Sequence, residues 1–385
     1  MTTDTTDRAN ETDVRDPKEA TDATDPTPGA DALGRVLVTG AGGFVGGRIA
    51  EVLCSQGADV RAGLRRWGSA ARIGRFPVDL ALCDVMDPAS IDAALEGVER
   101  VVHCAVGDRA VTVEGTHNML QAAARAGVRR FVHISTIDVY GDATGEVDET
   151  TPFGRTGRAY GDAKIEAEEA CQEAIAQGLP VTILRPTLIH GPFSESWTIE
   201  WASRLQDRPW LLSEEDCQGI CNLLYVDDLV RAVRLALVRE QAVGQAFNVN
   251  GPDRPTWQEY FEALNGALEL PPLVGQSKAA SRLSAGVMQP VRGFAKFLLA
   301  HFEAPIMGLY QRSVLAQRLM LVAERAIKKT PTTSEFGLLT KRASFPTAKA
   351  GELLGWTPRI DMAQGIDYGV AWLAHHGHLR DRPPL

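Results

Sequence analysis

The residues best suited to chemistry are a tyrosine and a lysine four positions apart, in the segment Y-G-D-A-K at 160–164. In a helix this spacing places Tyr160 and Lys164 on one face, one turn apart. A tyrosine has an ordinary pKa of about 10, and a general base at neutral pH needs a pKa near about 7. A lysine ammonium one turn away lowers the pKa of a tyrosine. The pair therefore indicates proton transfer, shared with a hydroxyl of Ser135 or Thr136 at the end of an earlier apolar run.

A glycine-rich segment, T-G-A-G-G-F-V-G, is the second candidate site, with Gly40, Gly43 and Gly46 three positions apart. An apolar run precedes it and apolar residues at helical spacing follow it, which is typical of a strand, a turn and a helix. Glycines let the backbone approach a ligand, and the free N–H groups of a helix start favour a phosphate. We interpret the segment as a phosphate site that includes Phe44 and Val45, although a plain strand–helix turn is the alternative.

The ends of the next two apolar runs carry candidate contacts to the ribose and the adenine of a cofactor. In V-R-A-G-L-R-R, Leu64 stands where an acid commonly meets a free ribose 2′-hydroxyl, and Arg65 and Arg66 follow, which suits a 2′-phosphate. The sequence therefore favours NADP as the cofactor, with Arg65 binding its 2′-phosphate. Asp84 and Val85 are candidate adenine contacts, but Asp84 is equally typical of a turn.

Strand-like and helix-like runs alternate along the chain after position 33. The strand-like runs lie at 35–39, 59–64, 78–84, 100–105, 130–135, 181–185 and 246–249, and the helical patterns at 43–56, 88–95, 115–126, 160–177 and 226–238. The alternation predicts an α/β fold, a doubly wound parallel sheet with helices on both faces. Ligands of such sheets bind outside the carboxyl ends of the strands, where the candidate residues fall.

Composition separates a tail from a body. The first 33 residues carry nine acids, three bases and no apolar run, so we predict a disordered acidic tail over 1–33. A dinucleotide-binding Rossmann domain is expected over 34–190, with a strand near 246–250 returning to it. The remainder, 191–385, is expected to be mainly a substrate domain, with a helical insertion at about 277–345.

The composition also bears on partners and compartment. The net charge of −9 gives no reason to expect a nucleic-acid partner, and no apolar stretch reaches the length of a membrane span. The six cysteines are scattered through apolar contexts, which favours a reduced, cytoplasmic protein. Cys217 and Cys221 lack a second Cys/His pair nearby, so no metal site is indicated.

Together these segments resemble the extended short-chain dehydrogenase/reductase superfamily, in particular its NAD-dependent epimerase/dehydratase family. The resemblance covers about 35–255 and returns at 352–358, through T-G-A-G-G-F-V-G, V-V-H-C-A, E-G-T-H-N-M-L-Q-A-A, S-T-I-D-V-Y-G, Y-G-D-A-K, L-R-P-T-L-I-H-G-P, Y-V-D-D-L-V-R-A, F-N-V-N-G and E-L-L-G-W-T-P. It implies a Rossmann domain and a smaller C-terminal substrate domain. It also implies Tyr160 as the base, Lys164 on the nicotinamide ribose, Thr136 at the family's Ser/Thr position and Ala105 beside the dinucleotide.

Departures from the family pattern narrow the expected activity. Thr112 stands where the family often has asparagine, Ile137 where dehydratases have their first acid, and Cys221 where nucleotide-sugar enzymes often have a phosphate-binding arginine. A dehydratase is therefore disfavoured, and a nucleotide-sugar substrate is weakened but stays open.

We expect an NAD(P)-dependent oxidoreductase or epimerase that transfers hydride at a secondary alcohol or ketone of a small molecule. One alternative is an NADP-dependent reductase resembling those that act on flavonoid or steroid ketones. Another is a dinucleotide-binding scaffold without turnover, and a homodimer is left open.

The segment 277–345 matches no pattern that we can place. It contains G-F-A-K-F-L-L-A-H-F and L-A-Q-R-L-M-L-V-A-E-R-A, which predict two amphipathic helices with basic polar faces. We favour a helical cap on the substrate domain, with attachment to a membrane surface or to a partner as the alternatives.

Overall fold

The computed structural model describes residues 33–379, so almost all of the tail predicted over 1–33 lies outside the described residues. Leu33, which we assigned to the tail, is 3% exposed and packs in the core of the sheet domain. The ordered body therefore includes one residue more than the sequence predicted.

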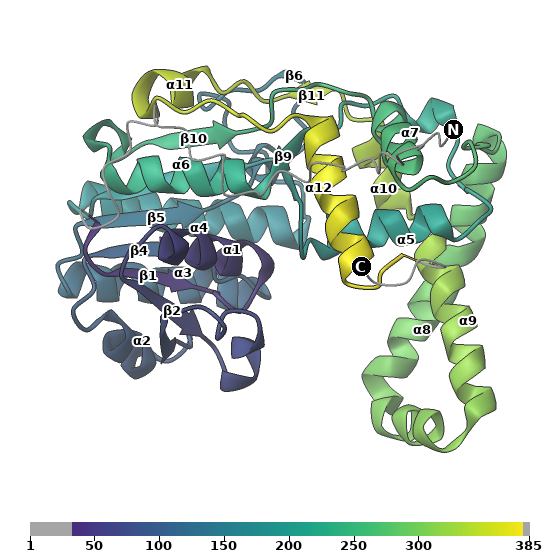
Figure 1. The fold of residues 1–385 in the computed structure, drawn as a ribbon, viewed down its shortest axis with the longest axis horizontal. Helices are drawn as coiled ribbons and strands as arrows, with labels where there is room; N and C mark the ends of the chain where they lie inside the picture. The colour runs from purple at the N-terminus through teal and green to yellow at the C-terminus, as the bar shows by residue number, and fades with distance from the viewer. Residues whose placement is uncertain (1–32, 380–385) are drawn as a thin grey trace, which may run out of the picture.

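A seven-stranded sheet in the order β10-β7-β5-β4-β1-β2-β3 organises the molecule (Figure 1). Its strands, in chain order, are β1 (Val36–Thr39), β2 (Val60–Leu64), β3 (Asp79–Leu82), β4 (Arg100–His103), β5 (Arg130–Ile134), β7 (Val181–Pro186) and β10 (Ala246–Val249). All neighbouring strands run parallel. The predicted doubly wound parallel sheet is confirmed, with strand ends displaced by at most two residues.

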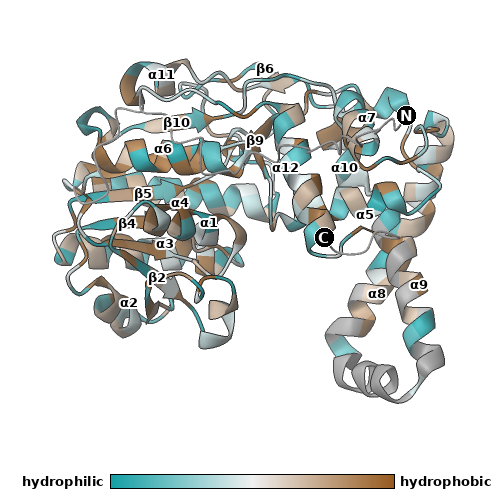
Figure 2. Cartoon of the chain, viewed as in Figure 1, coloured by the Kyte–Doolittle hydropathy of each residue, from teal (hydrophilic) through white to brown (hydrophobic). Residues whose placement is uncertain are grey.

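Helices cover both faces of this sheet. On one face lie α1 (Phe44–Ser55), α6 (Val226–Val238) and α11 (Ala348–Leu354), and on the other α2 (Pro88–Leu95), α3 (Arg109–Arg125) and α4 (Ala159–Ala176). Successive side chains of a strand point to opposite faces. In β1, accordingly, Val36 and Val38 pack in the first layer and Leu37 packs in the second. Figure 2 shows the resulting concentration of hydrophobic residues along the strands.

Helix α3 is the element whose start the sequence misplaced. We expected a helix from 115, but α3 begins at Arg109. Asp108 caps it, because its Oδ1 accepts from the backbone N–H of Val111 at 2.9 Å. An aspartate at an N-cap stabilises a helix start even where the first turn lacks an apolar periodicity.

The second half of the chain builds a smaller domain around aromatic residues. Its elements are β8 (Leu188–His190), η5 (Glu195–Ile199), α5 (Glu200–Gln206), η6 (Glu214–Cys217), β9 (Leu223–Tyr225), α7 (Trp257–Ala267), α10 (Thr333–Leu339) and α12 (Met362–His375). Trp201, Trp257 and Phe261 form its centre, with the rings of Trp201 and Phe261 4.7 Å apart. Two helices of the predicted 191–385 region, α6 and α11, pack on the seven-stranded sheet, and β10, at the strand expected near 246–250, is one of its strands.

The region 277–345 contains the two predicted helices, which are longer than expected. Helices α8 (Lys278–Arg312) and α9 (Val314–Lys329) form a hairpin that projects from the smaller domain (Figure 1). The same region supplies α10 and the short strand β11 (Ala343–Ser344), which pairs with β6 (Gly145–Glu146). Among the described residues, no helix combines the length and the hydropathy that crossing a membrane requires.

Short 3-10 turns complete the sheet domain. They are η3 (Trp67–Ala71), η4 (Ile137–Tyr140) and η7 (Glu240–Ala242). Two of them directly follow strands of the sheet, η3 after β2 and η4 after β5. They therefore carry residues to the edge at which the strands end, where the candidate site lies.

Candidate active site

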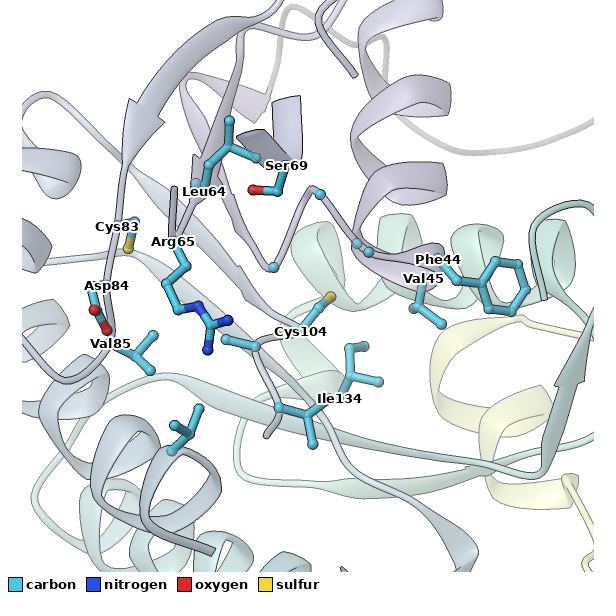
Figure 3. A pocket seen from close by; sticks show the side chains of 18 of the residues that line it. Phe44, Val45, Leu64, Arg65, Ser69, Cys83, Asp84, Val85, Cys104 and Ile134 are labelled. Atoms are coloured by element: carbon cyan, nitrogen blue, oxygen red, sulfur yellow. The ribbon is translucent and has the colours of Figure 1, made fainter. Parts of the chain in front are cut away.

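A pocket of about 470 Å³ lies at the carboxyl ends of the parallel strands (Figure 3). Every residue that we predicted to contact a cofactor lines it: Gly40, Gly43, Phe44, Val45, Gly46, Arg65, Asp84, Val85, Ala105, Tyr160 and Lys164. These residues follow or end different strands, and the parallel sheet gathers them at one edge. Thr136 does not line the pocket, whereas its neighbour Ser135 does.

The three glycines of the turn differ in backbone conformation and in the space available to a Cβ. Gly40 has φ +66°, a left-handed conformation that favours glycine. A Cβ at Gly46 would meet the Gly40 carbonyl oxygen at 2.6 Å, so Gly46 lets α1 pack against the turn. A Cβ at Gly43 would meet only that oxygen within 4 Å, at 3.3 Å, so Gly43 faces open space.

Gly43 is also the N-cap of α1, and no side chain caps this helix. The first N–H groups of a helix lack partners within it and attract anions. An uncapped helix start beside an open glycine, in a pocket of this size, fits the pyrophosphate of a dinucleotide.

Thr39, at the end of β1, holds the opposite wall of the pocket in place. Its Oγ1 accepts hydrogen bonds from the backbone N–H groups of Cys104 and Ala105, at 3.1 and 3.2 Å. It also hydrogen bonds with Nδ1 of His103 at 2.9 Å. Burial lowers the pKa of His103 to about 3, so this ring is neutral. His103 therefore belongs to the buried core of the sheet domain.

Arg65 extends into the pocket, between Asp84 and Val85 on one side and Cys104 on the other (Figure 3). Arg65 and Arg66 are both exposed and both line the pocket. Within residues 33–379 neither guanidinium has an ion-pair partner, although many other arginines of the chain do. Two unpaired positive charges therefore lie at the end of β2.

Asp84 forms a turn, the role that we considered as the alternative to an adenine contact. Its Oδ1 accepts from the backbone N–H of Met86 at 3.0 Å, and its own N–H donates to Ser90. The side chain also faces the pocket. The turn thus presents Asp84 and Val85 opposite Arg65.

Tyr160 and Lys164 lie one turn apart on α4, and both line the pocket. Lys164 is 4% exposed, and its Nζ donates to the carbonyl oxygen of Ile134 at 2.8 Å. Tyr160 is 49% exposed and hydrogen bonds with Thr136. Thr136 caps η4, and its Oγ1 accepts from the Asp138 N–H at 3.2 Å.

The expected lowering of the pKa of Tyr160 is wrong for the protein alone. Burial by the pocket wall and the nearby Asp138 carboxyl raise the pKa of Tyr160 to about 12, against a smaller opposite effect of the Thr136 hydrogen bond. Solvent in the pocket reaches half of the ring and weakens this effect. Burial also lowers the pKa of Lys164, to about 8, and its ammonium is directed at Ile134. Tyr160 is therefore protonated at neutral pH.

A buried polar network behind the site was missed from the sequence. Arg185 on β7 forms an ion pair with Glu168 on α4 at 2.6 Å, and both side chains are almost inaccessible, at 5% and 0%. Ser135 donates to the same carboxylate, and Arg185 donates to the hydroxyl of Tyr140 at 2.8 Å. Because Ser135 is committed to Glu168, Thr136 is the hydroxyl that remains for Tyr160.

A signal for this network was present in the sequence. Glu168 follows Lys164 by one helical turn, and Arg185 interrupts the apolar run of its strand. Charged residues at positions that a periodic pattern assigns to the interior are usually paired.

Two residues that depart from the family pattern, Thr112 and Cys221, are buried and hydrogen bonded. Thr112 is 1% exposed, and its hydroxyl lies 3.3 Å from both the N–H and the carbonyl oxygen of Gly107. Cys221 is fully buried in the aromatic core, and its N–H donates to Pro255. Within 33–379, no three His, Cys, Asp or Glu side chains are grouped to hold a metal ion.

A profile of the NAD dependent epimerase/dehydratase family matches residues 36–250. The chain belongs to this family, which confirms the predicted resemblance and, within the expected NAD(P)-dependent enzymes, supports dependence on NAD. The match and the site agree, because 36–250 contains every residue that lines the pocket.

The names of individual relatives refer to different substrates. Sterol demethylase protein B of Methylococcus capsulatus is 39% identical over 171 residues, covering 41% of this chain and 52% of that protein, so the match spans about half of that relative. Cinnamoyl-CoA reductase 1 of Oryza sativa subsp. japonica is 32% identical over 54% of this chain and 69% of its own length. UDP-glucuronic acid 4-epimerase from Bacillus cereus, solved in complex with NAD, shares the fold with a TM-score of 0.65 and 17% identity, over 89% of this chain and 98% of that chain.

Proposed function

We propose that the protein is an NADP-dependent oxidoreductase that reduces a ketone, or oxidises the matching secondary alcohol, of a small apolar molecule. The observation that carries the proposal is one pocket that joins three features. These are an uncapped glycine turn, two unpaired arginines and a Tyr–Lys pair. Each feature suits a different part of a nicotinamide dinucleotide and its reaction.

The chain's own groups would hold the cofactor along the pocket. The N–H groups at the start of α1 would bind its pyrophosphate, and Lys164 would bind its nicotinamide ribose. Arg65 would bind a 2′-phosphate, because Leu64 offers no acid for a free 2′-hydroxyl. When bound, the dinucleotide supplies or accepts the hydride.

The proton would be handled by Tyr160. A tyrosine with a pKa raised to about 12 is fully protonated at neutral pH, which suits a group that gives a proton to a ketone oxygen. Thr136, which hydrogen bonds with Tyr160, would orient that hydroxyl. The positive charge of a bound oxidised nicotinamide would favour the reverse direction by lowering the same pKa.

Two observations support an apolar substrate. Cys221 takes the place of an arginine that would hold a nucleotide-sugar phosphate, and it is buried away from the pocket. The pocket lining also includes the apolar side chains of Val106, Val111 and Ile189. The sterol and cinnamoyl groups in the names of two relatives point the same way. A nucleotide sugar, and with it an epimerase, is the second candidate.

A reducing compartment such as the cytoplasm is part of the proposal. All six cysteines are unpaired, and four of them are buried. Burial raises the pKa of the Cys83 and Cys104 thiols to about 12, so neither is a reactive thiolate at neutral pH.

The proposal is tested by removing one hydroxyl. Tyr160→Phe should lower turnover of NADPH with a ketone substrate by about 10²- to 10⁴-fold, the usual contribution of general acid–base catalysis. The dissociation constant of NADPH should hardly change. Tyr368→Phe is the matched control, because Tyr368 is also 49% exposed but lies on α12, away from the pocket.

The substrate for this assay is chosen by identifying small molecules that co-purify with the protein by mass spectrometry, together with a panel of sterol and aryl ketones. Near wild-type turnover of Tyr160→Phe would contradict the assigned role. Tight NADPH binding without turnover of any candidate would support the scaffold alternative.

A further inference from the structure

Helix α8 exposes a row of apolar side chains along one face. Leu283, Val287, Phe294 and Phe297 are 69%, 63%, 63% and 51% exposed. Their spacing of three, four and seven residues places them on the same side of a helix. The buried Ala285 lies on the opposite side. Contiguous exposed apolar residues of this kind mark a surface that binds something.

The hairpin that carries this row is strongly basic. Residues 278–329 contain nine lysines and arginines and two glutamates, a formal excess of seven positive charges in a chain of net charge −9. At the base of the hairpin, Lys278 lies 3.7 Å from Glu215 and Arg282 lies 2.9 Å from Asp216. Even with these two pairs neutralised, an excess of five positive charges remains.

We propose that the α8–α9 hairpin is a docking surface for an anionic lipid bilayer. An amphipathic helix with exposed phenylalanines and a basic surround binds in the headgroup region through its apolar face, and the lysines and arginines attract anionic lipids. The hairpin projects beyond the rest of the smaller domain (Figure 1). The hairpin lies on the membrane surface and does not cross it.

Two other occupants fit the hairpin less well. A second copy placed on it by a two-fold axis would bring the same positive surfaces together. The acidic tail has the opposite charge, but it contains no apolar run to cover the exposed phenylalanines. A bilayer with anionic headgroups supplies both an apolar region for the exposed side chains and negative charge for the lysines and arginines.

The test is flotation of the full chain with two kinds of vesicle, one of phosphatidylglycerol and phosphatidylcholine and one of phosphatidylcholine alone. We expect the chain to float with the anionic vesicles at about 0.1 M salt and to be released as salt is raised. The double variant Phe294→Ser, Phe297→Ser should partition at least about 10-fold more weakly. Tyr368→Ser, which removes an exposed aromatic side chain (49%) from α12, should partition like the wild type.

Circular dichroism and the melting temperature of each variant test whether the fold is kept. Three results would overturn the proposal: no flotation with anionic vesicles, salt-independent flotation with neutral ones, or an undiminished partition of the double variant. Light scattering that reports a dimer lost in the double variant, without vesicle binding, would instead assign the surface to a second copy. None of these readouts depends on catalysis.

Discussion

The two halves of the molecule solve different packing problems. The sheet domain buries aliphatic side chains on both faces of parallel strands, as in β1, where neighbouring residues serve opposite layers. The smaller domain buries a cluster of rings centred on Trp201, Trp257 and Phe261. Regular strands hold their ends in fixed register, whereas an aromatic cluster leaves surrounding loops and helices free to vary.

The pocket lies almost entirely in the sheet domain. The groups proposed for hydride and proton transfer end strands or open helices of the sheet domain, where backbone hydrogen bonds fix them. One example is Lys164 held by Ile134. The smaller domain contributes the hairpin and few residues of the pocket. Substitutions in the two halves should therefore fail in different ways.

The largest effect is expected at the glycine turn. Gly43→Val would fill the space left for a pyrophosphate and should weaken NADP binding by at least about 100-fold, equivalent to about 2.7 kcal/mol. The fold should survive, because a Cβ there meets a single atom within 4 Å, at 3.3 Å. Gly266→Val on α7 of the smaller domain, where a Cβ meets nothing within 4 Å, is the control and should bind normally. Calorimetric titration of both variants gives the comparison, and unchanged affinity of a folded Gly43→Val would remove the turn from the site.

Breaking the buried ion pair should have an effect of comparable size, seen in the free energy of unfolding instead of in cofactor binding. Glu168→Gln leaves the Arg185 charge uncompensated in the interior, and breaking a buried pair in this way costs about 3–5 kcal/mol. Glu169→Gln, next to it, breaks a pair with Arg155 in which both side chains are about half exposed, at 47% and 48%, and should cost far less stability because solvent screens the pair. Urea unfolding measures both, and similar losses would show that the network does not support the sheet domain.

A smaller effect is expected from the pH dependence of stability. Burial lowers the pKa of Lys164 to about 8, whereas an unfolded lysine titrates near about 10.4. Between these values the unfolded chain binds more protons than the folded one, so the free energy of unfolding should rise with pH. Relative to Lys164→Met, the wild type should gain up to about 1.4 kcal/mol per pH unit across this window. Parallel stability curves for the two proteins would mean that Lys164 titrates normally.

Local patterns predicted the sheet domain well, and physical reasons explain where they failed. Apolar periodicity located every strand of the sheet and the limits of α2 and α6. It missed the start of α3 because Asp108 acts there by capping. The resemblance placed the lining residues of the pocket in one site, since the order of motifs along parallel strands determines which strand ends meet.

What the sequence could not supply was the direction of side chains. The spacing of Tyr160 and Lys164 suggested a lowered tyrosine pKa, but the ammonium is directed at the Ile134 carbonyl. Glu168 and Arg185 meet because α4 packs on the strand that follows it, β7, so that two residues 17 positions apart form an ion pair that helical spacing alone does not reveal. The projection of the hairpin likewise depends on long-range packing, which helical periodicity alone does not encode.

The central claim, an NADP site that ends at Arg65, is tested most directly by four dissociation constants. NADP and NAD are titrated into the wild type and into Arg65→Ala at one fixed salt concentration. A charge-assisted hydrogen bond to a 2′-phosphate contributes about 1.5–3 kcal/mol, so the wild type should bind NADP about 10- to 100-fold more tightly than NAD. Arg65→Ala should narrow that gap while leaving NAD affinity nearly unchanged. Equal wild-type affinities, or a preference for NAD, would contradict the account.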